Sequence, residues 1–322
     1  MKKPILPLYI LLALLITGCS SDDNGTDGDG DEPTIVRLVV DSEATKPTLG
    51  NVNEAVWFTI DSMKVEIGGS STYGINPNLG KQDVTLRAIE ASDTLYLWAR
   101  WHDATANIWG GYIVKSSLEH EWDSATYTYD DQFFVLLDAG GDGVETGKMD
   151  VWNWMSSRTA PGFLAQDESW NGTVHTLDTV QPNINPYRRN WSNLMQKPFW
   201  MHRDTLDYTG SVLYLEDTVE MNVFLNWPAG YKLPGYAIDS TIHSSATRGE
   251  SSRWDVVAIS KYDSTGLDAS DYTWTVVFAR AMNTGRGDDV SLTSLDSIEV
   301  RIEATHNGSD SHSGSAPFWI IF

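Results

Sequence analysis

The sequence has little cysteine, little positive charge and no long apolar run. Its 322 residues include one cysteine, so an intrachain disulfide and a metal site built from several thiolates are excluded. There is no C-x-x-C-H segment, which excludes covalent attachment of haem. Lys and Arg total 22 against 44 Asp and Glu, and the net charge of −22 disfavours nucleic acid and anionic lipid surfaces as partners. Because covalent attachment of haem is excluded, any redox cofactor must be bound noncovalently.

Catalytic motifs are missing as well. The chain contains no G-x-S-x-G nucleophile elbow, no H-E-x-x-H motif and no Walker-type phosphate loop. None of its seven histidines has another histidine two or four residues away, so no zinc site can be read from local spacing. Carboxylate pairs carry no information in so acidic a chain. We therefore predict a binding protein rather than an enzyme.

The N-terminal segment has the features of an export signal. Lys2 and Lys3 precede an apolar run from Ile5 to Ile16, which is too short to span a bilayer. The segment from Ile16 to Cys19 resembles the bacterial lipobox, which implies cleavage before Cys19 and lipid on its thiol. We therefore predict a signal peptide over residues 1–18 and a lipid anchor in the cell envelope, facing the outer membrane or periplasm. An uncleaved anchor with an incidental cysteine is the alternative.

An acidic stretch follows the cysteine. Residues 20–33 contain no large apolar side chain, and together with Cys19 they are predicted to form a flexible tether over 19–33. The hexapeptide DGDGDE within it hints at a calcium loop, but the distal bidentate Glu of an EF-hand is missing. A tether is the better interpretation.

The remaining chain shows the two-residue period of β-strands. In SDTLYLWARWHD, Leu95, Leu97, Ala99 and Trp101 share one face, and residues 82–102 are predicted to form a hairpin. Further strand candidates are NEAVWFTI, DQFFVLLDA, VEMNVFLNW, RWDVVAIS, YTWTVVFARA, SIEVRIEAT and APFWIIF. Helical periodicity is weak throughout. We predict an all-β fold over residues 34–322, a single antiparallel β-sandwich with long irregular loops, of which 156–218 is the longest.

One cluster stands out, the segment MDVWNWMSSRTAPG over residues 149–162. Trp152 and Trp154 occupy alternate positions, so they point to one side of a strand, and Asn153 and Met155 point to the other. The pattern is typical of a strand that lines a binding site.

The order of several segments resembles the haem-binding domain of the gamma subunits of ethylbenzene dehydrogenase and related molybdenum enzymes. The matching segments are LYLWARWHDAT, DDQFFVLLDAG, DVWNWMSSRTAPG, GYKLPGY, RWDVVAIS, WTVVFARAMNTGRGDDV and HSGSAPFWIIF. The resemblance implies a β-sandwich that binds one b-type haem. It also implies electron transfer to a redox partner protein, whose identity the sequence does not indicate.

A haem site needs apolar walls, positive charge near the propionates and axial donors to the iron. We predict that the walls come from Trp101, Trp152 and Trp154. The charge is predicted to come from Arg158 and Arg280.

His312, at the start of the last matching segment, is the first choice of axial ligand, and Met155 is the second. Met149 is a further candidate. The central cluster departs from many relatives, which have His and Lys where this chain has Asn153 and Met155. We therefore expect that one family donor is either lost or replaced by the Met155 thioether.

Other interpretations remain open for these residues. Met155 can pack against tryptophan in a core, and His312 can be a solvated residue of a Ser/Gly-rich turn. Arg280 can form an ion pair with Asp288 or Asp289. The same segments also resemble carbohydrate-binding β-sandwich modules, in which exposed tryptophans stack on sugar rings. Burial of the tryptophans distinguishes the two functions, because a sugar site needs open ring faces. An envelope scaffold without a cofactor is a third possibility.

Overall fold

Alternating apolar residues build an all-β architecture. The computed structural model describes residues 36–69, 80–108, 112–115, 122–124, 130–141, 143–144, 147–171, 175–177, 187–189, 200–202, 212–214, 232–234, 236–238, 252–306 and 312–322. The predicted signal peptide, Cys19 and the tether lie outside these residues. Ile35–Phe322 form a single compact unit.

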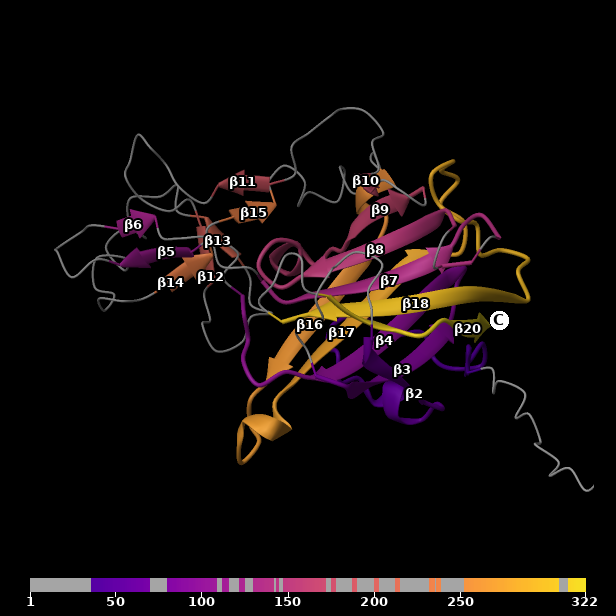
Figure 1. The fold of residues 1–322 in the computed structure, drawn as a ribbon, viewed down its shortest axis with the longest axis horizontal. Helices are drawn as coiled ribbons and strands as arrows, with labels where there is room; N and C mark the ends of the chain where they lie inside the picture. Colours follow the sequence, from indigo (N-terminus) through magenta and orange to yellow (C-terminus); the bar gives the residue numbers. More distant parts are fainter. Residues whose placement is uncertain are drawn as a thin grey trace, which may run out of the picture. The chain divides into compact units, whose positions relative to one another are not determined.

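The main sheet follows the path β10-β9-β8-β7-β18-β19-β2-β3-β4-β17-β16, and every neighbouring pair on this path is antiparallel (Figure 1). The first layer consists of β2 Met63–Gly69, β3 Gln82–Glu90, β4 Thr94–His102, β16 Val257–Asp263 and β17 Thr273–Ala281. The second layer consists of β7 Gln132–Asp138, β8 Met149–Met155, β9 Gln166–Trp170, β10 His175–Leu177, β18 Ser297–Thr305 and β19 His312–Ser315.

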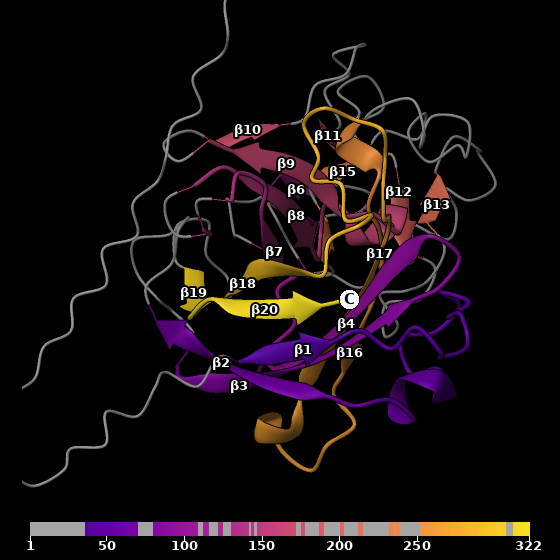
Figure 2. The same ribbon diagram turned by 90° about the vertical axis from the view of Figure 1, so that its right-hand side faces the viewer.

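Two more strands complete this sheet beside β18. β20 Phe318–Ile321 pairs antiparallel with β18, and β1 Arg37–Val39 pairs parallel with β20 (Figure 2). The register shifts where β19 meets β2, between Gly314 and Ser315, which is the kind of irregularity that lets a sheet turn a corner. The sheet therefore continues from one layer into the other.

The described residues also include small sheets and short 3-10 turns. The small sheets are β5 Tyr112–Lys115 with β6 Trp122–Ser124 and β14 Lys232–Pro234, β11 Tyr187–Arg189 with β15 Tyr236–Ile238, and β12 Trp200–His202 with β13 Val212–Tyr214. The 3-10 turns are η1 Ala55–Phe58, η2 Ala160–Gly162, η3 Ser252–Trp254 and η4 Ala269–Asp271.

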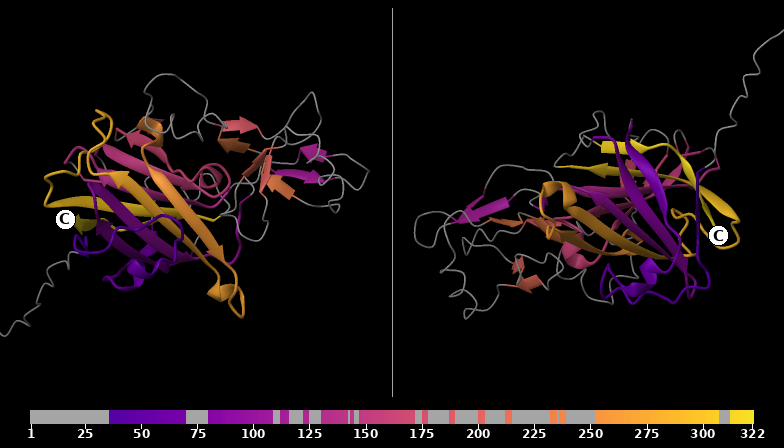
Figure 3. Two further views of the ribbon diagram at one scale, coloured as in Figure 1. Left: turned by 180° about the vertical axis from the view of Figure 1, so that it is seen from behind. Right: turned by 90° about the horizontal axis from the view of Figure 1, so that it is seen from below.

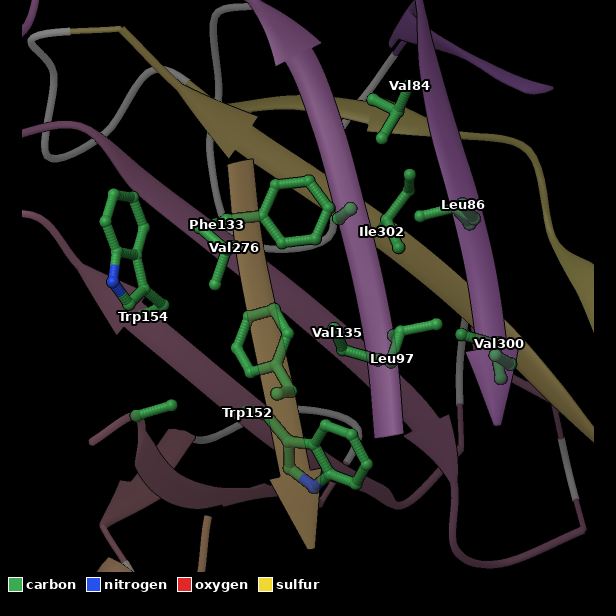
Figure 4. Packing of buried hydrophobic residues seen from close by; sticks show 14 of the residues in the cluster. Val84, Leu86, Leu97, Phe133, Val135, Trp152, Trp154, Val276, Val300 and Ile302 are labelled. Atoms are coloured by element: carbon green, nitrogen blue, oxygen red, sulfur yellow. The ribbon is translucent and has the colours of Figure 1, made fainter. Parts of the chain in front are cut away.

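The core lies between the two layers. Inward-facing side chains of β3, β4 and β17 meet those of β7, β8 and β18 in one apolar cluster. Figure 4 shows Leu97 and Val276 of the first layer close to Phe133 and Val135 of the second. Because each strand contributes alternate residues to this cluster, the arrangement is an antiparallel β-sandwich, as predicted.

The predicted hairpin at residues 82–102 is confirmed. β3 and β4 pair from Thr85 opposite Arg100 to Glu90 opposite Leu95. Ser92 and Asp93 connect them with φ of 54° and 55°. Two consecutive positive φ values are the mark of a type I′ turn, whose twist suits two antiparallel strands. The β3–β4 pair and the adjacent β17 and β16 lie side by side in the view from behind (Figure 3).

The outer face of the first layer is also covered. Trp57 packs there on Tyr96 and Trp98, and Trp98 Nε1 donates a hydrogen bond to the carbonyl of Val52 at 2.8 Å. The segment NEAVWFTI was predicted to be a strand, and this prediction was wrong. It forms the 3-10 turn η1, because Trp57 N–H bonds back to the Glu54 carbonyl and the indole is buried against the sheet.

Most other strand predictions agree with the structure. DQFFVLLDA, YTWTVVFARA, SIEVRIEAT and APFWIIF contain β7, β17, β18 and β20. RWDVVAIS is divided between η3 and β16, and VEMNVFLNW lies outside the described residues. The predicted loop 156–218 was too long, since Gln166–Trp170 within it form β9 and extend the second layer.

Candidate functional site

Strand β8 presents different chemistry to its two sides. Trp152 and Trp154 belong to the sandwich core, whereas Met149 and Val151 pack with Phe134 on the outer face of the second layer. All seven β8 residues are buried, so both faces of this strand are covered. The pleat places Asn153 and Met155 on the outer face with Met149 and Val151.

The three predicted wall tryptophans lie together in the core. Trp101 stacks on Phe133 with ring centroids 4.7 Å apart and lies edge-on to Trp154 at 6.0 Å. Trp154 also meets Trp274 at 5.0 Å, and Trp152 lies 6.1 Å from Phe278. The exposed fractions of Trp101, Trp152 and Trp154 are 1%, 0% and 0%. The structure therefore places these rings between the layers, on the opposite side of β8 from Met155.

The two predicted axial ligands share one face and one cross-strand row. Met155 pairs with Gln132 of β7, Gln132 pairs with Thr305 of β18, and Thr305 pairs with His312 of β19. Both side chains are buried, Met155 at 1% and His312 at 2% exposure. Three strand spacings separate their Cα atoms by roughly 14 Å. The fold thus brings together two residues that the sequence separates widely.

A carboxylate orients the His312 ring. Nδ1 of His312 lies 3.1 Å from Oε2 of Glu303, which is fully buried on β18. The ring lies over Phe134, with centroids 4.6 Å apart and planes inclined by 31°. Arg301 Nε lies 3.8 Å from the other Glu303 oxygen. A carboxylate on one ring nitrogen fixes the tautomer and directs the other nitrogen elsewhere.

Asn153 belongs to a second group of buried polar residues on the same face. Its Nδ2 donates to Glu168 Oε1 at 3.3 Å, and Gln166 Nε2 donates to the same oxygen. Arg253 of η3 donates from Nη2 to Gln166 Oε1 at 2.7 Å. We call Asn153, Gln166, Glu168, Arg253, Arg301, Glu303 and His312 the outer polar patch. Burying so many polar groups is costly unless they are paired or bind something.

The two predicted propionate partners lie apart from this patch. Arg158 follows β8, keeps 30% of its side chain exposed, and pairs with Asp130 at 3.0 Å. Arg280 of β17 points into the sandwich, where its side chain is fully buried with its guanidinium 5.6 Å from the centre of the Trp152 ring. Each arginine therefore pairs with carboxylates that do not belong to the outer polar patch.

Arg280 is the centre of a buried ionic cluster. Its Nη2 lies 2.9 Å from Asp150 and 3.3 Å from Asp289, and its Nε lies 3.7 Å from Asp167. The alternative of an ion pair with Asp289 is therefore confirmed. Burial raises the pKa of Asp150, although the Arg280 charge and the Val290 N–H act in the opposite direction. Arg280 thus anchors one end of the core.

Sequence reasoning missed Phe134 and Glu303, which contact the His312 ring. A signal was present, because SIEVRIEAT alternates apolar residues with Glu299, Arg301 and Glu303. Such an alternation of apolar and charged residues normally indicates a strand with a solvated outer face. Here Arg301 and Glu303 on the outer face are buried as well, and only the structure reveals this.

Comparison with protein families gives one match over most of the chain. The family model described as ethylbenzene dehydrogenase matches residues 54–316. The chain belongs to the ethylbenzene dehydrogenase family. Its matched region includes β8, β18, His312 and the outer polar patch. No curated protein sequence matches the chain significantly.

Comparison with solved structures gives a distant similarity. A protein from Bacteroides uniformis ATCC 8492, provisionally described as carbohydrate-binding, has 9% sequence identity and a TM-score of 0.38. The match covers 89% of this chain and 91% of the other.

Proposed function

We propose that this family member binds one noncovalent b-type haem on the outer face of β7, β8, β18 and β19 and uses it for electron transfer without catalysing a reaction of its own. The observation that carries the proposal is the common row of His312 and Met155. These are an imidazole and a thioether, a pair of donors typical of haem iron in electron-transfer proteins. Family membership supplies the second support.

The residues on this face fit such a group. His312 has a carboxylate on Nδ1, the arrangement that strengthens and orients an imidazole ligand. Phe134 offers an apolar ring beside it. Arg301 and Arg253 are buried cations on the same side of the sheet, suitable as partners for two propionates. A bound haem would supply a one-electron iron couple, whose potential these residues tune through ligand identity and burial.

The core tryptophans have a different role in this proposal. Trp152 and Trp154 hold β8 against the first layer, and in doing so they set the position of Met155 on the other side of the strand. Met149 shares the outer face with Met155 but lies six residues away along β8, on the order of 20 Å. Met155, in the His312 row, is therefore the preferred second ligand.

Carbohydrate binding through stacked tryptophans has less support. The described tryptophan side chains are buried or partly buried, and none is exposed. Sugar stacking requires an accessible ring face. We keep carbohydrate binding as the alternative outcome of the test below.

We propose that lipid on Cys19 anchors the protein to the cell envelope, because the segment before it resembles a lipobox. The helices in the described part of the chain are 3-10 turns of three or four residues, and none of them could cross a membrane. Metabolic labelling with a radioactive fatty acid should label the wild-type chain and leave the Cys19→Ala variant unlabelled. A wild-type chain without label, or equal labelling of the variant, would contradict lipid anchoring at Cys19.

The haem proposal is tested by absorption spectroscopy of the full chain, purified in detergent after expression with added haem. A sharp Soret band, with resolved α and β bands after reduction by dithionite, is expected for a low-spin b-type haem. His312→Ala should lose the low-spin spectrum. If the wild-type chain retains no haem after gel filtration, the proposal fails, and binding to a glycan array becomes the next measurement.

A further inference from the structure

Three strand ends meet at one end of the sandwich and bring together two carboxylates and an imidazole. Asp103 directly follows β4, Asp131 directly precedes β7, and His306 directly follows β18. One ligand atom from each residue lies within 4.8 Å of the other two. None of these three residues belongs to the cross-strand row of His312 and Met155. The cluster takes no part in the proposed haem site.

The distances suit a shared cation. His306 Nδ1 lies 2.9 Å from Asp103 Oδ1 and 3.9 Å from Asp131 Oδ1. Tetrahedral ligands of a zinc ion, at about 2.0 Å from the metal, are separated from one another by about 3.3 Å. The three atoms therefore need only small adjustments to face a common ion.

Asp131 is held in place by groups around it. The Asn107 backbone N–H and Trp274 Nε1 donate to Oδ2 at 2.7 Å and 2.9 Å. The Asn107 side chain donates to Oδ1 at 3.1 Å. Such supporting hydrogen bonds orient carboxylate ligands at metal sites. Asp131 is fully buried, so its orientation does not depend on solvent.

Asp103 provides the observation that points to a ligand. The residue is 1% exposed, and its Oδ2 has no hydrogen-bond partner in the described part of the chain. The other oxygen accepts from the Thr105 N–H at 3.1 Å and faces His306. A buried carboxylate oxygen without a partner is costly. A cation bound to the Asp103 carboxylate would satisfy this oxygen.

We propose that Asp103, Asp131 and His306 bind one divalent transition metal ion of the zinc type. The imidazole favours such an ion over calcium or magnesium, which prefer all-oxygen sites. Two carboxylates balance the charge of the ion, and the His306 side chain is 34% exposed, which leaves a route from solvent. Three protein ligands leave a fourth position for water or an exogenous ligand.

The other buried carboxylate cluster is a poorer candidate. Asp150, Asp167 and Asp289 also lie within 4.8 Å of one another, but Arg280 already pairs with all three. A guanidinium in the cluster supplies part of the balancing charge and repels a metal ion. This cluster therefore serves as an internal control.

The test is calorimetric titration of the full chain, purified in detergent without added haem and treated with a chelator. Zn²⁺ is added in a background of millimolar Ca²⁺, which occupies sites made of carboxylates alone. One high-affinity Zn²⁺ per chain is expected. His306→Gln should weaken this affinity at least about hundredfold, because it removes a ligand. Asn107→Ala, which removes only a supporting side chain, should weaken it about tenfold to hundredfold.

Two matched variants complete the design. His102→Gln removes a partly exposed imidazole at the end of β4 that contacts the Ala269 carbonyl, and it should leave the Zn²⁺ affinity unchanged. Asp150→Asn, in the Arg280 cluster, should also leave the Zn²⁺ affinity unchanged. Circular dichroism of each apo variant establishes that it is folded. Absence of high-affinity Zn²⁺ uptake, equal uptake by His306→Gln, or loss of uptake in Asp150→Asn would each overturn the proposal.

Co²⁺ provides a second readout. Bound at a site with one imidazole and two carboxylates, it should give visible absorption bands whose intensity reports a four-coordinate geometry. His306→Gln should lose these bands, while His102→Gln should keep them. Bands that persist in His306→Gln would place the ion elsewhere and contradict the assignment.

Discussion

Met155 of β8 and His312 of β19 lie in one cross-strand row on the outer face of the second layer, with Gln132 and Thr305 between them. Neither residue is near the other in the chain. Their common orientation follows from the antiparallel register of four strands, and it is the geometric basis of the proposed haem site.

The first prediction compares two methionines on β8. Met155→Leu should replace the low-spin haem spectrum with a high-spin one, because the thioether donor is removed while the apolar volume is nearly kept. Met149→Leu is the matched control, since Met149 is buried on the same face but outside the His312 row. Absorption spectra of both reduced variants measure the effect. Equal spectra for both variants would show that Met155 is not a ligand.

The second prediction concerns Glu303, which acts on the haem through His312. Glu303→Gln should weaken haem binding about tenfold to hundredfold and raise the midpoint potential, because a neutral amide donates less electron density through the imidazole. Potentiometric titration and haem transfer to apomyoglobin measure the two quantities. Glu299→Gln, on the same strand, is the control. If the potential stays at the wild-type value, the Glu303 contact is only structural.

The third prediction tests the Arg280 cluster. Arg280→Met should lower the free energy of unfolding by about 3 to 5 kcal/mol at pH 7, because three buried carboxylates lose their cation. The deficit should shrink as the pH falls, because burial raises the pKa of Asp150 and protonation of this carboxyl removes one of the charges. Urea unfolding at pH 7 and at a lower pH measures it.

Arg286→Met is the control for this experiment, since Arg286 pairs with Asp255 at 3.3 Å and keeps 23% of its side chain exposed. Its cost should be about 1 kcal/mol or less. Similar costs for the two arginine variants would contradict the assigned role of Arg280 in the core.

The fourth prediction concerns pH. Burial raises the pKa of Asp255 from 3.8 to about 6, although the Arg286 charge opposes the rise and the Asp289 charge adds to it. The folded state therefore holds this proton more tightly than the unfolded state. Its stabilisation is complete below pH 3.8 and is lost as the pH rises through about 6.

Between these pH values, Asp255 should make the free energy of unfolding fall by less than about 1 kcal/mol per pH unit, after allowance for solvent screening. Asp255→Asn should remove this component of the slope. Urea unfolding of both proteins at pH 4, 5, 6 and 7, with a chelator present, measures the difference. Identical slopes would show that Asp255 titrates alike in the folded and unfolded states.

Much of the fold was predictable because strand periodicity is a local property. The alternation of Leu95, Leu97, Ala99 and Trp101 indicated both the strand and its core face, and the structure agrees. NEAVWFTI was mispredicted because a short apolar run has the same composition in a strand and in a buried turn. There the packing of Trp57 against Tyr96 and Trp98 decides the outcome.

The candidate site was less predictable, for a different reason. The sequence showed Trp152 and Trp154 on one side of β8 and Met155 on the other, but not that both sides are buried. The three tryptophans and Arg280 are consequently in the core, apart from the outer face that carries His312. Phe134 and Glu303 were missed because their importance depends on which strands neighbour β18.

The sequence by itself determined the all-β class, the noncovalent nature of any cofactor and the two faces of each strand, because composition and the pleat are local. Only the tertiary structure decided which faces meet and which residues share a row. Strand register depends on pairing between segments far apart in the chain, and a shift of one residue would exchange the faces. The row of Met155 and His312, and the meeting of Asp103, Asp131 and His306, both follow from that long-range pairing.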